Sequence, residues 1–530
     1  MERLIKIRTP SVYRLTVNKN KQTTNERRGR MSYSWIVVVF LVFGLPLGQG
    51  GAGVLDNQPW APPNAVGASA FRSQFNSATI LSLGDYGNAT FAPVVYATSR
   101  SSSPNNGDVT LTYLPDSQGN VIPDFSYAGY GGGGVILPVD LDAPTWYISP
   151  SNVSTLQSLV NSVASSPLNV STAYRGIIQF QQGYYNLTGV TINVQFVSGI
   201  LFRGVGSDAS TGTVLLVGDA PFFVNGHAPS PIATYANITS PVPTGSRRLY
   251  LADTTGLAVG DLVHVCTWIT SAWKASVDTN DTLASSFNVT RYVTAVTASY
   301  IEVDAPMYYQ IFTGIVANSS ADYTTRNLGW ANMRVVRQVG NPNLGVFIDA
   351  HGGIIDLFMK NVVTEYVGTL FQGSGYLSRR FTFEDCVALF NPIVTGHDPD
   401  SRQMFRIYQL SELLIHRCSQ VYGRAFFGIQ DTLTGSGIVI SHCTDLRTWR
   451  GYYIFGAWFP GQLVDHVYSE YGLSFGPTAY GSRTGVASLI WNSYASFEDG
   501  SPAVLDCTSP ETSMQNLCVG TTSGDTLKWK

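Results

Sequence analysis

The sequence is poor in charged residues. Asp, Glu, Lys and Arg make up 13% of its 530 residues, and the formal net charge is −3. That content is about half the usual share, and it argues against nucleic acid and against an anionic membrane surface as the main partner. The chain also lacks a Gly-X-X-X-X-Gly-Lys loop and a His-Glu-X-X-His segment. Nucleotide-binding and zinc-protease functions are therefore unsupported.

Cysteine is scarce as well. The six cysteines include no Cys-X-X-Cys pair, which argues against a structural zinc site, and no metal site is predicted. Cys507 and Cys518 close a short loop in a polar tail, so we expect a disulfide between them in a secreted chain. Three others occupy one repeat position, where they form either an interstrand disulfide or a ladder of buried thiols. The pairing of four cysteines stays open: Cys266, Cys386, Cys418 and Cys443.

No apolar run near the N-terminus is long enough to span a membrane comfortably. Residues 35–47 are apolar, follow a basic leader and precede small residues, which is the pattern of a secretory signal. We therefore expect residues 1–55 to be a leader plus signal peptide, and the mature protein to be secreted. The alternative is an uncleaved signal anchor, which would hold the protein in the secretory pathway or at the plasma membrane.

Asn-X-Ser/Thr sequons favour the secretory route, and all of them precede residue 330. They are glycosylation acceptors in a cell that modifies such sites. The candidate acceptors are Asn88, Asn152, Asn169, Asn186, Asn237, Asn280, Asn288 and Asn318.

A short phrase recurs through the last two hundred residues. Each copy is apolar, then has two mostly polar residues, then a small or apolar one. The copies end at Met333, Val362, Cys386, Cys418, Cys443, Val467 and Ser493, which are 29, 24, 32, 25, 24 and 26 residues apart. The segments before each turn are short and β-branched, aromatic or aliphatic, and long helical periodicity is absent. This spacing predicts a solenoid built of strands, an all-β parallel β-helix.

The rest of the chain is organised around this solenoid. We expect an irregular strap at residues 56–120, the β-helix at 121–500 and a C-terminal tail at 501–530. A capping helix is predicted near Thr155 to Ser165, where it would cover the open end of the core. Alternating, turn-separated runs predict a small antiparallel β insertion at 241–312.

Parts of the sequence resemble pectate-lyase-like secreted β-helix proteins. The opening of that family is matched by Asp124 to Tyr130, Gly183 to Leu187, Leu201 to Gly206, and Gly212-Thr213. A bacterial branch is matched by Gly260 to Val263, Arg402, Arg424, Trp458, Gly461 to Asp465, and Trp491-Asn492. The resemblance covers roughly residues 120 to 495 and implies a right-handed parallel β-helix (the pectin lyase fold) with polysaccharide as its substrate class. The chain departs from that branch where histidines are expected, at Phe455 to Ala457, Tyr480 to Gly485, and Ala425.

The loop from His397 to Arg402 is the strongest candidate site. It concentrates charge in a charge-poor chain, and loops on a rigid scaffold often carry function. Elimination at a uronate needs a base and a group that neutralises the sugar carboxylate, and Arg, His or a calcium ion held by Asp could supply these. The alternative is a solvated loop with a local ion pair. The candidate catalytic residues are His397, Asp398, Asp400, Arg402 and Arg406, and the candidate substrate-binding residues are Arg424, Arg450 and Trp458.

The polar column of the repeat invites a catalytic interpretation, but we interpret it as structural. Asn, Asp and His tolerate the left-handed backbone conformation of a sharp turn. The column consists of Asn332, Asn361, Asp385, Arg417, His442, His466 and Asn492. From these observations we expect a secreted protein that acts on extracellular polysaccharide, as a polysaccharide lyase. The alternatives are a non-catalytic carbohydrate-binding or matrix protein, and a glycoside hydrolase.

Overall fold

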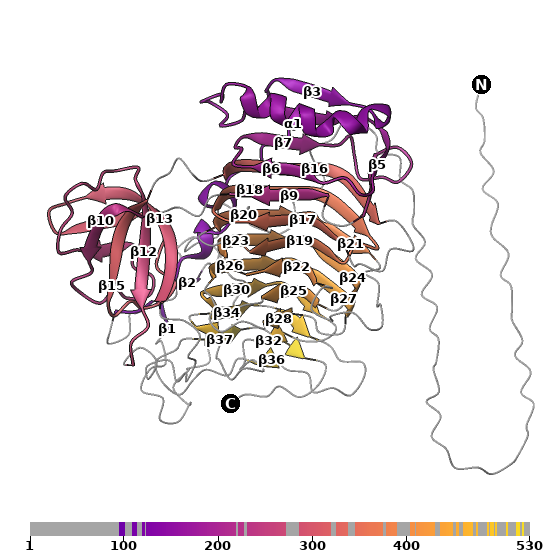
Figure 1. Ribbon diagram of the computed structural model, residues 1–530. Coiled ribbons are helices and arrows are strands. Elements are labelled where there is room, and N and C mark those ends of the chain that lie inside the picture. The colour runs from indigo at the N-terminus through magenta and orange to yellow at the C-terminus, as the bar shows by residue number, and fades with distance from the viewer. Residues whose placement is uncertain are drawn as a thin grey trace, which may run out of the picture. The chain divides into compact units, whose positions relative to one another are not determined.

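The computed structural model shows a parallel β-helix that carries a separate antiparallel sheet (Figure 1). The described residues belong to one compact unit, Trp60–Lys530. They are 95–100, 109–113, 119–121, 123–218, 221–226, 231–271, 286–319, 325–337, 345–374, 378–389, 403–408, 410–423, 425–429, 435–448, 452–454, 459–469, 473–474, 485–486, 488–491, 493–495, 505–506, 516–519 and 522–523.

The first parallel sheet, sheet A, contains the strand that precedes the polar column in each coil. Neighbouring strands of sheet A pair in parallel through backbone hydrogen bonds, and Figure 1 shows these strands stacked from one coil to the next. Its strands are β3 (Thr145–Ile148), β4 (Gly176–Phe180), β7 (Ile200–Arg203), β16 (Thr325–Arg337), β18 (Ile354–Glu365), β20 (Ser378–Glu384), β23 (Leu410–His416), β26 (Ser436–Ser441), β30 (Gln462–Asp465), β34 (Ser488–Trp491) and β37 (Asn516–Val519).

Two further parallel sheets complete each coil. Sheet B also includes the C-terminal parts of β16 and β18. Its other strands are β5 (Gly183–Leu187), β8 (Thr213–Val217), β21 (Val387–Leu389), β24 (Ser419–Gly423), β27 (Thr444–Thr448), β31 (Tyr468–Ser469), β35 (Tyr494–Ala495) and β38 (Thr522–Ser523). Sheet C contains β6 (Ile192–Gln195), β9 (Phe222–Asn225), β17 (Val346–His351), β19 (Thr369–Ser374), β22 (Gln403–Ile407), β25 (Ala425–Ile429) and β28 (Tyr452–Ile454).

The coil therefore has three strands, one in each sheet. The strands of sheet B, such as Ser419–Gly423 and Thr444–Thr448, were not apparent from the sequence. These segments mix polar and apolar residues because Gln420 and Asp445 point into the core. Their composition hides the alternation that marks a half-buried strand.

Two sharp corners lie five residues apart on sheet A in the six coils from β16 to β30. The second corner is the predicted polar column, and its described residues have φ between +52° and +57°. They are Asn332, Asn361, Asp385, Arg417, His442 and His466. The first corner also has positive φ and comprises Asn327, Asp356, Arg380, Glu412, Gly437 and Gly461. The conformational interpretation of the polar column is thus confirmed, and a second column stands beside it.

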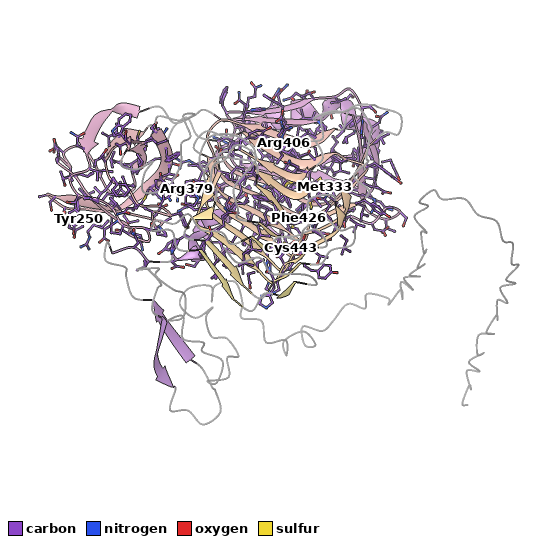
Figure 2. All side chains as sticks on the ribbon, turned by 90° about the horizontal axis from the view of Figure 1, so that it is seen from below. Tyr250, Met333, Arg379, Arg406, Phe426 and Cys443 are labelled. Carbon is purple, nitrogen blue, oxygen red and sulfur yellow. The ribbon has the colours of Figure 1, made fainter. Side chains whose placement is uncertain are left out.

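The core of the β-helix is a continuous stack of inward-facing apolar side chains. Phe202 and Trp330 of neighbouring coils stack with ring centroids 5.2 Å apart, and Phe383 of sheet A stacks on Phe405 of sheet C with centroids 4.7 Å apart. Phe426, Met333 and Cys443 belong to the same core and are labelled in Figure 2. Burial of this surface is the main favourable term in the stability of the fold.

The open N-terminal end of the core is covered by a helix, as the sequence predicts. Helix α1 (Leu156–Ser165) buries Leu156, Val160 and Val163 and follows the 3-10 turn η5 (Pro150–Thr155). Two shorter 3-10 turns, η3 (Phe125–Tyr127) and η4 (Tyr130–Gly132), lie further upstream. Among the helices of the described residues, none is long and apolar enough to cross a lipid bilayer.

The antiparallel sheet has the strand order β10-β15-β12-β13-β14-β11. It has its own apolar cluster, which includes Val263, Val289 and Ile301. Its strands are β10 (Pro231–Asn237), β11 (Arg248–Tyr250), β12 (Leu262–Trp268), β13 (Ser286–Val296), β14 (Tyr300–Val303) and β15 (Gly314–Ser319). The sheet therefore extends beyond residues 241–312 at both ends.

The remaining strands are short pairs. Strands β1 (Val95–Arg100) and β2 (Val109–Tyr113) pair in antiparallel fashion within the segment expected to be an irregular strap. Two parallel pairs lie late in the chain, β29 (Phe459–Pro460) with β33 (Gly485–Val486) and β32 (Leu473–Ser474) with β36 (Leu505–Asp506).

The first corner ends in two glycines that the ring of Tyr308 covers. Gly437 has φ +67°, and a Cβ built there would lie 2.4 Å from the Tyr308 ring. We expect Gly437→Ala to destabilise the protein by about 2–4 kcal/mol, because backbone strain and overpacking add. Gly189→Ala is the matched control, since Gly189 has φ +70° and nothing within 4 Å of its Cβ position. It should cost only about 1 kcal/mol. Urea unfolding measures both, and equal losses would contradict the packing argument.

Candidate functional site

A row of polar and aromatic side chains crosses the outer face of sheet C. Parallel pairing places Phe223 beside Asp349, Asp349 beside Gln372, and Gln372 beside Arg406. All four are partly exposed. Arg406, labelled in Figure 2, donates from Nη1 to Gln372 Oε1 at 3.3 Å, and Gln372 Nε2 donates to Asp349 Oδ1 at 3.3 Å. The row thus places an anion-binding side chain in line with a carboxamide and a carboxylate. We call it the sheet C row.

Two further side chains extend the sheet C row along the strand direction. His351 Nε2 lies 3.0 Å from Asp349 Oδ1, and the His351 ring lies 5.3 Å from that of Phe223. At the other end, Arg406 Cζ lies 5.3 Å from the centroid of the Tyr408 ring. A carboxylate that orients an imidazole is a common arrangement for a general base. Aromatic rings can stack on sugar faces, while amide and guanidinium groups bind hydroxyls and carboxylates.

Arg406 is the one predicted catalytic residue that lies within the described part of the chain. The others, His397, Asp398, Asp400 and Arg402, lie outside the described residues, as do Arg424, Arg450 and Trp458. Strand β22 begins at Gln403, directly after Arg402 in the chain. The candidate loop therefore leads straight into the strand that carries Arg406.

Sequence reasoning missed Phe223, Asp349, His351 and Gln372 as partners of Arg406. They come from segments up to 183 residues away in the chain, as with Phe223 and Arg406. Only the register of sheet C brings them together. One signal was available for three of them, because Asp349, His351 and Gln372 each precede alanine or glycine near the end of an apolar run.

The second corner carries an uneven set of polar side chains. Its first two coils hold an amide ladder, in which Asn361 Nδ2 donates to Asn332 Oδ1 at 3.0 Å. The next coils hold ion pairs: Arg417 donates from Nε to Asp385 Oδ1 at 2.7 Å and also pairs with Glu384. The last described coils hold the stacked rings of His442 and His466, with centroids 4.8 Å apart.

Protonation is disfavoured for two of the histidines at this corner. Burial, together with the nearby Arg417 and His442, lowers the pKa of His416 to about 4. Burial likewise lowers the pKa of His442. Burial would raise the pKa of Asp385, but the hydrogen bond and charge of Arg417 outweigh it and lower that pKa. The imidazoles of His416 and His442 are therefore uncharged at neutral pH.

The carboxylates beside the second corner do not have the spacing of a glycoside hydrolase pair. Glu384, His416, Ser441 and Asp465 occupy equivalent positions on four successive strands. Three interstrand steps of about 4.8 Å separate Glu384 from Asp465, or about 14 Å. Retaining and inverting hydrolases place their two carboxyl groups about 5–5.5 Å and 6.5–9.5 Å apart. These two carboxylates are thus too distant to flank one glycosidic bond.

The first corner holds a buried ion cluster that the repeat pattern did not reveal. Glu412 Oε1 lies 3.0 Å from Arg291 Nη1, and Glu412 Oε2 lies 2.5 Å from Arg379 Nη2. All three side chains are 0% exposed. Arg379 also pairs with Asp304 at 3.0 Å. A column five residues before each residue of the polar column was visible in the sequence, although its composition varies from Asn to Gly.

This cluster joins the antiparallel sheet to the β-helix through charge. Burial would raise the pKa of Asp304, but Arg379, Arg380 and Arg291 outweigh it and lower that pKa. Burial raises the pKa of Asp356, which accepts a hydrogen bond from the backbone of Gly131 at 2.8 Å. Buried pairs of this kind are structural anchors rather than accessible sites.

The repeat cysteines form a ladder of buried thiols, which is one of the two alternatives that the sequence left open. Cys386, Cys418 and Cys443 are free and buried, and adjacent coils link Ser419 N to Cys386 O at 2.9 Å and Thr444 N to Cys418 O at 3.0 Å. Burial raises the pKa of the Cys386 and Cys418 thiols well above the usual value. They are therefore inert hydrophobes. Cys266 is also free, whereas the side chains of Cys507 and Cys518 lie outside the described part of the structure.

The sequons that can be placed differ in exposure. Asn152, Asn186 and Asn237 are exposed, while Asn169, Asn288 and Asn318 are partly exposed. Asn88 and Asn280 lie outside the described residues. The exposed side chains would be reachable for glycosylation in a secretory compartment.

A calcium site was expected only from Asp398 or Asp400, which the structure does not describe. Among the described residues, His442, Asp465 and His466 form a group of three potential ligands whose donor atoms lie within 4.8 Å of one another. Nitrogen donors do not suit calcium, which takes oxygen ligands.

The comparisons with known proteins find structural likeness without sequence kinship. No protein-family model matches the chain, and no curated protein matches it. Tailspike protein gp49 from Pseudomonas phage LKA1 aligns at 12% identity and a TM-score of 0.42, over 70% of this chain and 57% of the tailspike chain. Endo-xylogalacturonan hydrolase from Aspergillus tubingensis aligns at 8% identity and a TM-score of 0.31, over 72% of this chain and 93% of the hydrolase. At these TM-scores the likeness carries no argument about function.

The β-helix expected from the pectate-lyase-like resemblance is present in the structure itself. The assignment to that particular family stays an expectation from the sequence.

Proposed function

We propose that the protein is a secreted carbohydrate-active protein that cleaves an extracellular acidic polysaccharide by β-elimination. The observation that carries this proposal is the sheet C row, in which Arg406 lies in line with Gln372 and Asp349. A guanidinium binds a carboxylate bidentately and would neutralise that of a uronate. Neutralisation makes the adjacent C5 proton easier to remove. Its loss forms a double bond between C4 and C5 as the bond from C4 to the glycosidic oxygen breaks, and that oxygen takes up a proton.

The base for that proton would come from one of two places. His351 is held by Asp349 on the same row, and His397 lies in the loop that leads into β22. Within the described residues of the row, Asp349 is the carboxylate. Hydrolysis requires two such groups flanking the bond, so the row favours the lyase over the hydrolase. Asp398 or Asp400 would have to supply the second carboxylate of a hydrolase.

A panel of uronate-containing and neutral polysaccharides tests this proposal. We expect ultraviolet absorbance of an unsaturated product to appear with a uronate substrate, because elimination leaves a double bond at the new non-reducing end. Neutral polysaccharides should give neither this signal nor reducing ends. Reducing ends without the unsaturated product would indicate a hydrolase, and silence across the panel with and without calcium would refute enzymatic activity.

A non-catalytic carbohydrate-binding protein is the second candidate. It is favoured because this chain has Phe455 to Ala457 and Ala425 at positions where the resembled branch has histidines. Binding on a glycan array without turnover, lost when Phe223 or Tyr408 is replaced, would support this function.

A further inference from the structure

The last described coils of the second corner bring together the polar side chains of Ser441, His442, Asp465 and His466. His466 Nδ1 lies 2.5 Å from Asp465 Oδ1, and His442 Nδ1 lies 4.0 Å from Asp465 Oδ2. The carboxylate of Asp465 thus stands between the same nitrogen of two imidazoles. Ser441 Oγ lies 2.6 Å from His442 Nδ1 and 3.1 Å from Asp465 Oδ2. The potential ligand atoms of His442, Asp465 and His466 all lie within 4.8 Å of one another.

We propose that His442, Asp465 and His466 bind a first-row divalent transition-metal ion, for which Zn²⁺ is the probe. Zinc bonds to nitrogen and carboxylate oxygen are about 2.0–2.2 Å long, so a tetrahedral ion holds its ligand atoms about 3.3 Å apart. Asp465 lies 2.5 Å from His466 Nδ1 through Oδ1 and 4.0 Å from His442 Nδ1 through Oδ2, and these two separations bracket that value. Imidazole and carboxylate ligands suit zinc, copper, nickel and iron rather than calcium or magnesium.

The rings need a small adjustment to bind an ion. The planes of His442 and His466 are 7° from parallel, with centroids 4.8 Å apart, whereas two ligands must direct their lone pairs toward one ion. The χ2 torsion of histidine is broad, so the rings can tilt toward each other at low cost. The side chains of His442, Asp465 and His466 are 30%, 22% and 26% exposed, so an ion can enter from solvent.

The corner itself shows that its backbone does not require histidine. Asn332 and Asn361 adopt the same left-handed conformation in earlier coils and ladder through their amides. The chain changes to His442 and His466 in the same coils in which the preceding residues are Ser441 and Asp465. A turn residue alone explains neither the pair of histidines nor the carboxylate between them.

The surrounding charge permits a cation. Arg417 lies on the coil before His442, and Glu384 and Asp385 neutralise its guanidinium. His416 packs edge-on against His442, with ring centroids 5.4 Å apart.

Calorimetric titration of the chelator-treated full chain with Zn²⁺ tests the proposal. We expect one ion per chain with a dissociation constant in the micromolar range or tighter. His442→Asn and His466→Asn should each weaken binding at least about 10-fold. Asparagine keeps the left-handed turn, as at Asn332, so both variants should retain the urea midpoint of the parent protein. Visible absorption of bound Co²⁺ reports the ligand set directly and should disappear in the double variant.

His351→Asn is the matched control, because His351 also pairs with a carboxylate, Asp349, at 3.0 Å. It should leave Zn²⁺ binding unchanged. Stoichiometric binding that persists in the folded double variant would overturn the assignment. So would the absence of any zinc binding in the parent chain at millimolar ion. The test is independent of polysaccharide cleavage, because the proposed metal ligands are not part of the sheet C row.

Discussion

Replacing Glu412 with glutamine should lower the free energy of unfolding by about 3–5 kcal/mol. Glu412 sits between Arg291 and Arg379, and all three side chains are 0% exposed. The neutral amide keeps the shape of the side chain but leaves two buried guanidinium groups with less compensating charge. Removing one partner of a buried ion pair costs far more than the pair contributes, because the remaining charge has no solvent around it.

Glu302→Gln is the matched control for this prediction. Glu302 pairs with Arg248 at 2.7 Å on the same antiparallel sheet, but these side chains are 35% and 44% exposed. An exposed pair contributes about 0–1 kcal/mol, so its loss should be small. Urea unfolding followed by fluorescence measures both variants. A Glu412 variant no less stable than the Glu302 variant would show that the buried cluster does not anchor the fold.

Replacing Arg406 with alanine should reduce turnover of a uronate polysaccharide by about 10²–10³-fold, as the loss of a charge-stabilising donor does elsewhere. Arg406 lies on the outer face of β22 and contacts Gln372 and Tyr408, so its removal takes away the side chain proposed to neutralise the sugar carboxylate. Its core neighbours are untouched, so the urea midpoint should change little. Arg406→Lys should recover only part of the activity, because lysine keeps the charge without the bidentate geometry.

Arg334→Ala is the control arginine, since Arg334 pairs with Glu365 at 2.6 Å on sheet B, away from the sheet C row. It should leave turnover unchanged. Arg402→Ala should resemble Arg406→Ala if the loop that enters β22 forms part of the same site. A protein whose turnover is indifferent to Arg402, Arg406, Asp398 and Asp400 together would contradict this location of the site.

The sequence predicted the elements that depend on residues close together in the chain. The capping helix near Thr155 and the left-handed corner at Asn332, Asn361 and His442 could be predicted because each requires a particular residue type at a particular place. The shared position of the three cysteines could be predicted because the repeat places them at one position in successive coils. The strands of sheet B could not be predicted, because buried Gln420 and Asp445 break the apolar alternation.

The sequence by itself determined the period, the β-class and the polar column, because a coil of fixed length repeats its turn chemistry at fixed intervals. Only the tertiary structure decided which distant residues meet. Parallel register places Asp349 beside Gln372 and Arg406, and packing of the antiparallel sheet brings Arg291 to Glu412. These contacts depend on the alignment of coils and on a separate sheet. No local pattern encodes them, because interstrand neighbours are set by hydrogen-bond register rather than by separation along the chain.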